Sequence, residues 1–326
     1  MEARSGQLSG GLRASAAYLL TGSLAGVNAA IPGYPVFAAQ ALRYTLATIV
    51  LAAACWAQRR RHPLDGPKVR VTRRVVVLLG LQATVGVTGF NYCTAEAVRH
   101  TGAATVGTVI ATVPVVLAIA APLAAQRHPA PRVLAAAMLV AAGAAVTTGL
   151  GGTNLPGLLL ALGALVAEVS FTLVAVPLLP AFGPLRLAAW VSACSVPVLF
   201  GLGFATGGAG AVPAPTASQA AAIVYLAVVV CAGGFYLLYS ALPRLGADRV
   251  GLFAGLVPFG AMGAALLLNA GTVRPADMAG AVLVAAGVAA GAGTRTRARA
   301  ETGQPDEEFT AAAPQLGRTR TGAPRA

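Results

Sequence analysis

Charged residues are scarce in this 326-residue sequence. They make up 10% of it, whereas 57% of the residues are hydrophobic and the mean hydropathy is +0.74. Soluble domains carry about 25% charged residues. The few charges here also stand in short patches between long apolar runs. This pattern excludes an ordinary soluble domain and indicates a protein that crosses a membrane several times.

Residue types that serve metal binding or catalysis are also few. The three histidines, His62, His100 and His128, fall in predicted loops. The cysteines lie in apolar runs without metal or redox spacing, and we interpret them as packing residues: Cys55, Cys93, Cys194 and Cys231. No phosphate-binding loop or dinucleotide motif occurs. The sequence therefore predicts no metal site, no cofactor and no enzymatic activity.

Ten apolar runs have about the length of a membrane-spanning helix. They are rich in Ala, Leu, Val and Gly and lack the period-two alternation of strands. The runs cover residues 14–31, 35–57, 74–93, 103–125, 131–150, 156–178, 184–205, 219–241, 247–268 and 276–293. The predicted fold class is an all-α membrane protein with ten transmembrane helices.

The basic residues predict how these helices are oriented. If the N-terminus is cytoplasmic, 20 of the 23 Lys and Arg residues fall in cytoplasmic segments, and only Arg99 and Arg274 lie in outer loops. This distribution satisfies the positive-inside rule, with both termini on the cytoplasmic side of the cell inner membrane. We therefore interpret the net charge of +13 as a topology signal and a contact for anionic membrane lipid, not as a nucleic-acid surface.

Polar segments flank the apolar runs at both ends. Residues 1–13 are predicted to be a cytoplasmic N-terminus without a cleavable signal peptide. Residues 294–326 are polar and rich in Pro and Gly, which predicts a disordered cytoplasmic tail.

The sequence repeats itself at an offset of 144 residues, without a gap from about residue 83 to 145. The coinciding positions include Tyr92 and Tyr236, Gly102 and Gly246, Val113-Pro114 and Val257-Pro258, and "LVAAG" at 139–143 and 283–287. This predicts two five-helix repeats, 14–150 and 156–293. Because five is odd, the second repeat is inverted in the membrane, and inverted repeats favour transport through a site between the halves.

Pro114 and Pro258 stand near the centres of two equivalent runs. A proline inside a helix removes one hydrogen bond and opens a kink. Corresponding breaks in both halves of a transporter indicate the binding region. A plain structural kink is the alternative interpretation.

Several segments together resemble a known family. They are "ALRYTLATIVLA", "NYCTAEAVRHTGAATVGTVIATVPVV" and "LYSALPRLGADRVGLFAGLVPF", with the repeat endings "AAMLVAAGAAV" and "GAVLVAAGVAA". The chain resembles, over about residues 14–293, the EamA-type permeases of the drug/metabolite transporter superfamily. The resemblance implies ten helices around a central cavity that move small metabolites or drugs, often outward.

The chain departs from that family at two kinds of position. A Gly-Glu pair that often ends the fourth and ninth helices is replaced by Gln126-Arg127 and Ala270-Gly271. In the sixth helix, Glu168 stands where a Trp is common. The substrate of relatives is therefore not carried over to this chain.

Arg43 and Glu168 are the two ionisable residues placed deep in apolar runs. A charge at the bilayer centre costs roughly 2.5–3.5 kcal/mol on insertion scales and usually faces the protein interior. We expect both near mid-depth, in different halves. Either they face the cavity, where Arg43 binds an anionic group and Glu168 an amine or a proton, or they pair with each other as a structural ion pair.

Polar side chains at helical spacing are further binding candidates. Asn91 is the strongest of them because a full amide must be satisfied. The others are Thr84 and Thr88 on the third run, Thr108 and Thr112 on the fourth, and Tyr236 as part of an apolar wall. Threonines that bond to their own helix, and aromatics that only pack, are the alternatives.

The sequence thus predicts a secondary transporter, and more specifically an exporter, of a small organic metabolite, amino acid or drug-like solute. Protons are a candidate coupling ion. Two other classes stay open: an intramembrane enzyme acting on a lipid carrier, and a membrane scaffold without transport activity.

Overall fold

The computed structural model describes residues 2–29, 34–61, 72–101, 103–148, 154–207, 212–268 and 275–292. The chain divides into one unit of Met1–Ala292 and a second of Gly293–Ala326, and the described residues all belong to the first. The predicted tail of residues 294–326 lies outside them. Every regular element in the described part of the chain is a helix, so the all-α prediction is confirmed there.

The first half of the chain forms eight helical segments. Four are α1 (Glu2–Ala29), α2 (Val36–Arg61), α3 (Arg73–Leu81) and α4 (Phe90–Thr101), with a π-helical segment, η1 (Gln82–Gly89), between the last two. Then come α5 (Ala103–Ile110), α6 (Val113–Ala124) and α7 (Pro131–Thr148). Thr72 caps the start of α3, because its hydroxyl accepts the Val75 backbone N–H at 3.4 Å.

The second half begins with α8 (Leu155–Gly207), which is two helices joined at a kink. Gly183 adopts a φ of 69° at the kink, and Pro184 follows without a backbone N–H to donate. The remaining elements are α9 (Ala217–Tyr225), π-helical η3 (Leu226–Gly233), α10 (Gly234–Leu245), α11 (Ala247–Val250), 3₁₀-helical η4 (Gly251–Leu256), α12 (Val257–Leu267) and α13 (Pro275–Ala292).

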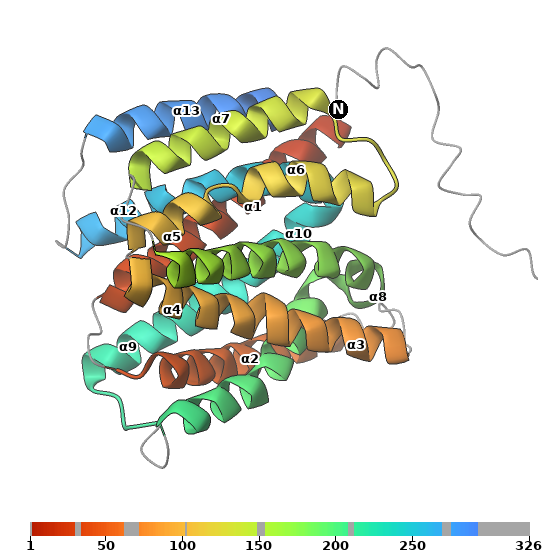
Figure 1. Ribbon diagram of the computed structural model, residues 1–326. Coiled ribbons are helices and arrows are strands. Elements are labelled where there is room, and N and C mark those ends of the chain that lie inside the picture. Colours follow the sequence, from red (N-terminus) through yellow and green to blue (C-terminus); the bar gives the residue numbers. More distant parts are fainter. Residues whose placement is uncertain are drawn as a thin grey trace, which may run out of the picture. The chain divides into compact units, whose positions relative to one another are not determined.

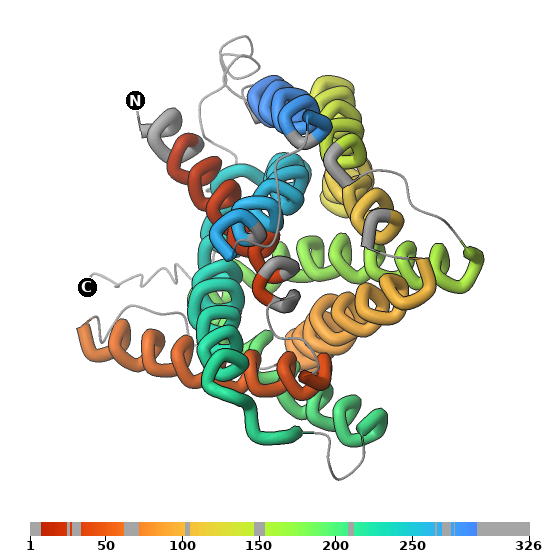
Figure 2. The backbone as a smooth tube through the Cα atoms, turned by 90° about the vertical axis from the view of Figure 1, so that its left-hand side faces the viewer, coloured from red at the N-terminus to blue at the C-terminus, as the bar shows by residue number. Residues whose placement is uncertain are grey.

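Most of these elements recur at the offset of 144 residues. The succession α3, η1 and α4 reappears as α9, η3 and α10, and α7 reappears as α13, with the same lengths. Packing crosses between the halves: α1 lies against α10 and α12, α8 lies against α2, α4 and η1, and α7 lies against α13. Figures 1 and 2 show the α7–α13 pair side by side. The two repeats therefore share one packed core.

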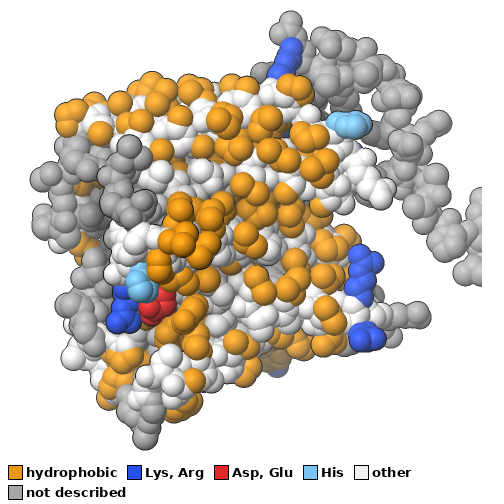
Figure 3. Space-filling view, in the orientation of Figure 1, with side chains coloured by type: hydrophobic (Ala, Val, Ile, Leu, Met, Phe, Trp, Pro, Cys, Tyr) orange, Lys and Arg blue, Asp and Glu red, His pale blue; other side chains and the backbone are white. Residues whose placement is uncertain are grey.

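The surface has the character expected of a membrane protein. Among the described residues, five helices are long and apolar enough to span a membrane, and 131–146 and 278–291 are shorter apolar segments. Figure 3 shows hydrophobic side chains across the face over α7, α6, α4 and α3, with charged side chains near the helix ends. The surface of a soluble domain would carry charges throughout.

Two features differ from the predicted runs. Helix α1 begins at Glu2, before the apolar run that starts at residue 14, and its early part packs on α10, since a Cβ on Gly10 would lie 3.0 Å from the Arg244 side chain. The runs 103–125 and 247–268 are each divided instead of merely kinked. Pro114 and Pro258 stand at the second residue of α6 and α12, where a proline needs no hydrogen-bond partner.

Gly22 of α1 and Gly260 of α12 allow these helices to approach closely. A Cβ on Gly22 would overlap the Val257 carbonyl oxygen, and one on Gly260 would overlap that of Leu19. Small residues at such crossings are how membrane helices bring their backbones together. Gly263, one turn further along α12, faces open space.

We predict that Gly260→Ala destabilises the protein by about 1–3 kcal/mol, because the added methyl overpacks a backbone contact. Gly263→Ala on the same helix should leave stability unchanged or slightly raised. Size-exclusion of the detergent-solubilised protein after heating measures both. Equal stability of the two variants would show that the α1–α12 crossing is not close.

Candidate solute-binding site

A small pocket lies where helices of the two halves meet. It encloses about 70 Å³ and is lined by α1, α2, η1, α4, α8, η3 and α10. Arg43, Glu168 and Asn91 line it together with aromatic side chains of Tyr18, Tyr44, Phe90, Phe171 and Phe235. Organic ligands occupy sites of about 300–1,000 Å³, so the pocket in this conformation has room for a few waters only.

Helical periodicity explains why the two charges point inward. On α2, Gln40, Arg43, Tyr44, Ala47 and Leu51 share the buried face, at spacings of three and four residues. On α8, Ala164 and Thr172 are buried one turn before and one turn after Glu168. Each charge therefore sits on the face of its helix that packs into the bundle.

The Arg43 guanidinium is buried without an ionic partner. The residue is 4% exposed, and its Nε and Nη1 atoms have no hydrogen-bond acceptor. Its guanidinium carbon lies 5.0 Å from the centre of the Tyr44 ring, and Cys231 is a further polar neighbour. Buried donors of this kind cost several kcal/mol when unsatisfied. Arg43 thus presents two donor atoms without an acceptor at the pocket.

Arg43 and Glu168 line the same pocket but form no ion pair with each other. Arg99 and Glu96, at the exposed end of α4, do form an ion pair, at 3.3 Å. The structure therefore disfavours the interpretation of Arg43 and Glu168 as a mutual structural salt bridge in this conformation.

Both π-helical segments contribute lining residues to the pocket. Gly86 and Val87 come from η1, and Val230 and Cys231 come from η3. A π-turn inserts one extra residue into a helix and is frequent at functional sites. The same irregularity thus occurs at equivalent places in both repeats, directly against the pocket.

A wide vestibule continues from the pocket at one end of the bundle. It has a volume of about 940 Å³ and shares Leu24, Phe90 and Asn91 with the pocket. Its rim includes the start of α2, the last turn of α4 and the last residues of α8. A solute can therefore approach the pocket from this end.

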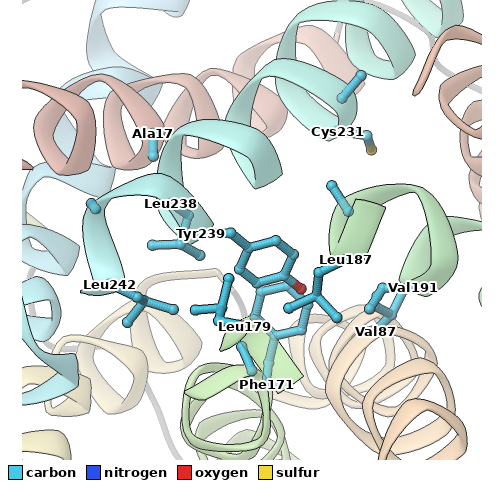
Figure 4. Close-up of a cluster of buried hydrophobic side chains, with 14 of the residues drawn as sticks. Ala17, Val87, Phe171, Leu179, Leu187, Val191, Cys231, Leu238, Tyr239 and Leu242 are labelled. Atoms are coloured by element: carbon cyan, nitrogen blue, oxygen red, sulfur yellow. The ribbon is translucent and has the colours of Figure 1, made fainter. Parts of the chain in front are cut away.

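The opposite end is closed by a packed layer. The Gln82 side-chain amide donates to the Phe171 carbonyl oxygen at 3.1 Å and to the Tyr239 hydroxyl at 2.9 Å. The Phe171 and Tyr239 rings stack with centres 5.7 Å apart. Figure 4 shows Leu179, Leu187, Leu238 and Leu242 around these rings. We name this packed cluster, which lies on the side of the pocket away from the vestibule, the inner plug.

The remaining predicted site residues do not line the pocket. Thr84 and Thr112 are exposed, and their hydroxyls bond to the Gly80 and Val109 carbonyls at 2.7 and 2.6 Å. Thr88 bonds to Ala83 within its own helix, and Tyr236 is 40% exposed. Thr108, Pro114 and Pro258 are likewise absent from the pocket lining. Asn91 lines the pocket while its amide donates to the Val87 carbonyl at 2.7 Å.

Sequence reasoning missed Gln82, Tyr44, Phe90 and Phe235. Gln82 carries a signal that could have been used, since a full amide in an apolar run must find partners. The aromatic residues carry none, because a ring in an apolar helix is as often lipid-facing as buried.

The fold and the pocket define a helical membrane protein with two repeats around a shared site. The model of the EamA-like transporter family matches residues 14–149 and again residues 155–290. The chain therefore belongs to the EamA-like transporter family, and it is a membrane transporter of the drug/metabolite type.

The chain is also similar to an individual transporter sequence and to a solved structure. The uncharacterized transporter YetK of Bacillus subtilis (strain 168) is 26% identical over 237 residues, which cover 70% of this chain and 69% of YetK. A solved crystal structure matches with a TM-score of 0.70 and 18% identity, over 87% of this chain and 97% of its own. That similarity supports the fold alone.

We predict that the effects of Arg43→Gln and Glu168→Gln on the free energy of unfolding add, with a coupling below about 0.5 kcal/mol. Breaking a buried ion pair would cost about 3–5 kcal/mol and would be relieved in the double variant. Denaturant unfolding of the two single variants and the double variant measures the coupling. A coupling above about 1 kcal/mol would mean that the two charges pair.

Proposed function

We propose that this protein is a secondary transporter that moves a small organic solute across the inner membrane by alternating access. The observation that carries the proposal is the placement of the pocket between the repeats. Four pairs of lining residues are related by the offset of 144: Gly86 and Val230, Val87 and Cys231, Phe90 and Gly234, and Asn91 and Phe235. Because a site on such a pseudo-symmetry axis is lined by both repeats, a movement of either repeat can change access to it.

The repeat also supports a second conformation. Thr94, Ala95 and Val98 line the open vestibule, and their equivalents are Leu238, Tyr239 and Leu242 in the inner plug. If the two halves exchange their conformations, the plug opens into a vestibule at the other end while the present one closes. The pocket then faces each side of the membrane in turn.

The orientation follows from the proposed ten-span topology with both termini cytoplasmic. Arg59, Arg186 and Arg244 lie towards the end of the inner plug, and by the positive-inside rule this end is cytoplasmic. The vestibule then opens to the outside. Export is the direction that the resemblance to permeases of this type implies.

The pocket chemistry favours a solute that carries an acid and an amine. Arg43 offers two unpartnered donors to a carboxylate, and Glu168 offers a carboxylate to an ammonium group. The aromatic side chains provide an apolar wall around both. In the absence of an amine, Glu168 is the group that can carry a coupling proton.

The two other classes receive less support from the site. An enzyme acting on a lipid carrier needs several acids or histidines together, and the pocket lining contains one acid, Glu168. A purely structural role as a scaffold would not account for the buried Arg43 donors without an acceptor, or for the vestibule that leads to them.

Uptake into proteoliposomes tests the proposal with three radiolabelled probes: phenylalanine, phenethylamine, which lacks the acid, and 3-phenylpropionate, which lacks the amine. We expect phenylalanine flux to fall at least tenfold in both Arg43→Gln and Glu168→Gln, because each removes one ionic contact. Any residual flux of the amine should depend on Glu168, and that of the acid on Arg43.

Thr45→Val is the matched control on α2, because this hydroxyl bonds to the Ala41 carbonyl at 2.7 Å and lies outside the pocket. It should transport as the unchanged protein does. Absence of flux for these probes and for a wider panel of amino acids, amines and drugs, under both proton and solute gradients, would refute the transporter mechanism.

A further inference from the structure

A second cavity lies on the flank of the bundle, away from the central pocket. It has a volume of about 330 Å³ and is formed by α2 and the second half of α8. Its lining includes Trp56 and Arg59 from α2 and Arg186 and Trp190 from α8. None of its lining residues is shared with the central pocket or the vestibule. The cavity is therefore separate from the solute path.

The tryptophans point to the membrane interface. The sequence contains two of them, and both line this one cavity. Trp56 is 57% exposed and Trp190 52% exposed, although both stand on apolar helices. Tryptophan is enriched where hydrocarbon meets the polar headgroups, because its ring is apolar and its N–H donates a hydrogen bond. The two tryptophans therefore favour a position of the cavity at headgroup depth.

The arginines give the cavity its charge preference. Arg59 and Arg186 both line it, and Arg60 lies on the Trp56 ring with 3.6 Å between the guanidinium carbon and the ring centre. Among the residues that the structure describes, none of those lining the cavity is acidic. An arginine presents a planar fork of donors that matches phosphate oxygens. A phosphate group is therefore the chemical partner that the cavity favours.

The floor of the cavity accommodates a chain rather than a compact ion. Ala52 on α2 and Ala189 on α8 are small, and the lining is overwhelmingly apolar apart from the two arginines and Thr48. An isolated inorganic anion would make no favourable contact with these apolar residues. An acyl chain next to a phosphate would contact this apolar surface. Burying the chain from water would contribute about 0.8 kcal/mol per CH₂, and a chain that comes from the bilayer is already in apolar surroundings.

We propose that this groove is a binding site for an anionic phospholipid, whose phosphate is held by Arg59 and Arg186 and whose headgroup region lies between Trp56 and Trp190. The site lies at the end of the bundle that carries the basic residues, where anionic lipids are attracted to a protein surface. It includes residues next to the Gly183 kink of α8, so a bound lipid would brace α2 against the second half of that helix.

The intrinsic fluorescence of the protein reports on this site directly, because both tryptophans belong to it. The full chain is reconstituted in vesicles in which brominated phosphatidylglycerol or brominated phosphatidylcholine serves as the quencher. We expect the anionic lipid to be preferred about fivefold or more. In the double variant Arg59→Gln/Arg186→Gln, the ratio of quenching by phosphatidylglycerol to quenching by phosphatidylcholine should fall to near one.

Arg127→Gln/Arg132→Gln is the matched control, because it removes the same charge from two exposed positions, one after the end of α6 and one in the first turn of α7. It should keep the preference. Equal quenching by the two lipids in the unchanged protein, or an unchanged preference in the groove variant, would overturn the proposal. A preference that inorganic phosphate or glycerol phosphate in the buffer abolishes would show a soluble-anion site instead and would also overturn it.

Discussion

The burial of one guanidinium constrains the arrangement of this protein more than any other interaction. Arg43 is 4% exposed, yet two of its nitrogen atoms lack an acceptor. A bundle that only needed to be stable would pair this charge or replace it with an apolar residue. Under the proposed function, a bound solute supplies the missing acceptor, and the vestibule leads to the pocket that Arg43 lines.

The duplicated architecture places this single site between the two repeats. The equivalent π-helical segments η1 and η3 lie against the same pocket from opposite repeats. The two segments differ in their side-chain hydrogen bonds. Gln82 at the start of η1 bonds to Phe171 and Tyr239, whereas its equivalent at the start of η3, Leu226, is apolar. The hydrogen bonds of the inner plug therefore have no counterpart at the equivalent position of the second repeat.

Part of this arrangement could be predicted from the sequence. The apolar runs, the repeat at 144 residues and the inward direction of Arg43, Glu168 and Asn91 follow from hydropathy, self-similarity and the cost of charge in lipid. Whether Arg43 meets Glu168 depends on the relative rotation of α2 and α8, which no local pattern encodes. Threonine spacing fails for a similar reason, because Thr84 and Thr88 can satisfy their hydroxyls on their own helix.

The most direct test is the reciprocal accessibility of Val98 and Leu242, measured as single cysteines in a protein whose four native cysteines are replaced by alanine. Val98 lines the vestibule, and Leu242 is 3% exposed in the plug. With a membrane-impermeant thiol reagent, Val98→Cys should react from the outside and Leu242→Cys from the cytoplasmic side. Any solute gradient that speeds one reaction should slow the other. Labelling rates that do not respond to each other, or a Leu242→Cys that never reacts while transport proceeds, would contradict alternating access through this pocket.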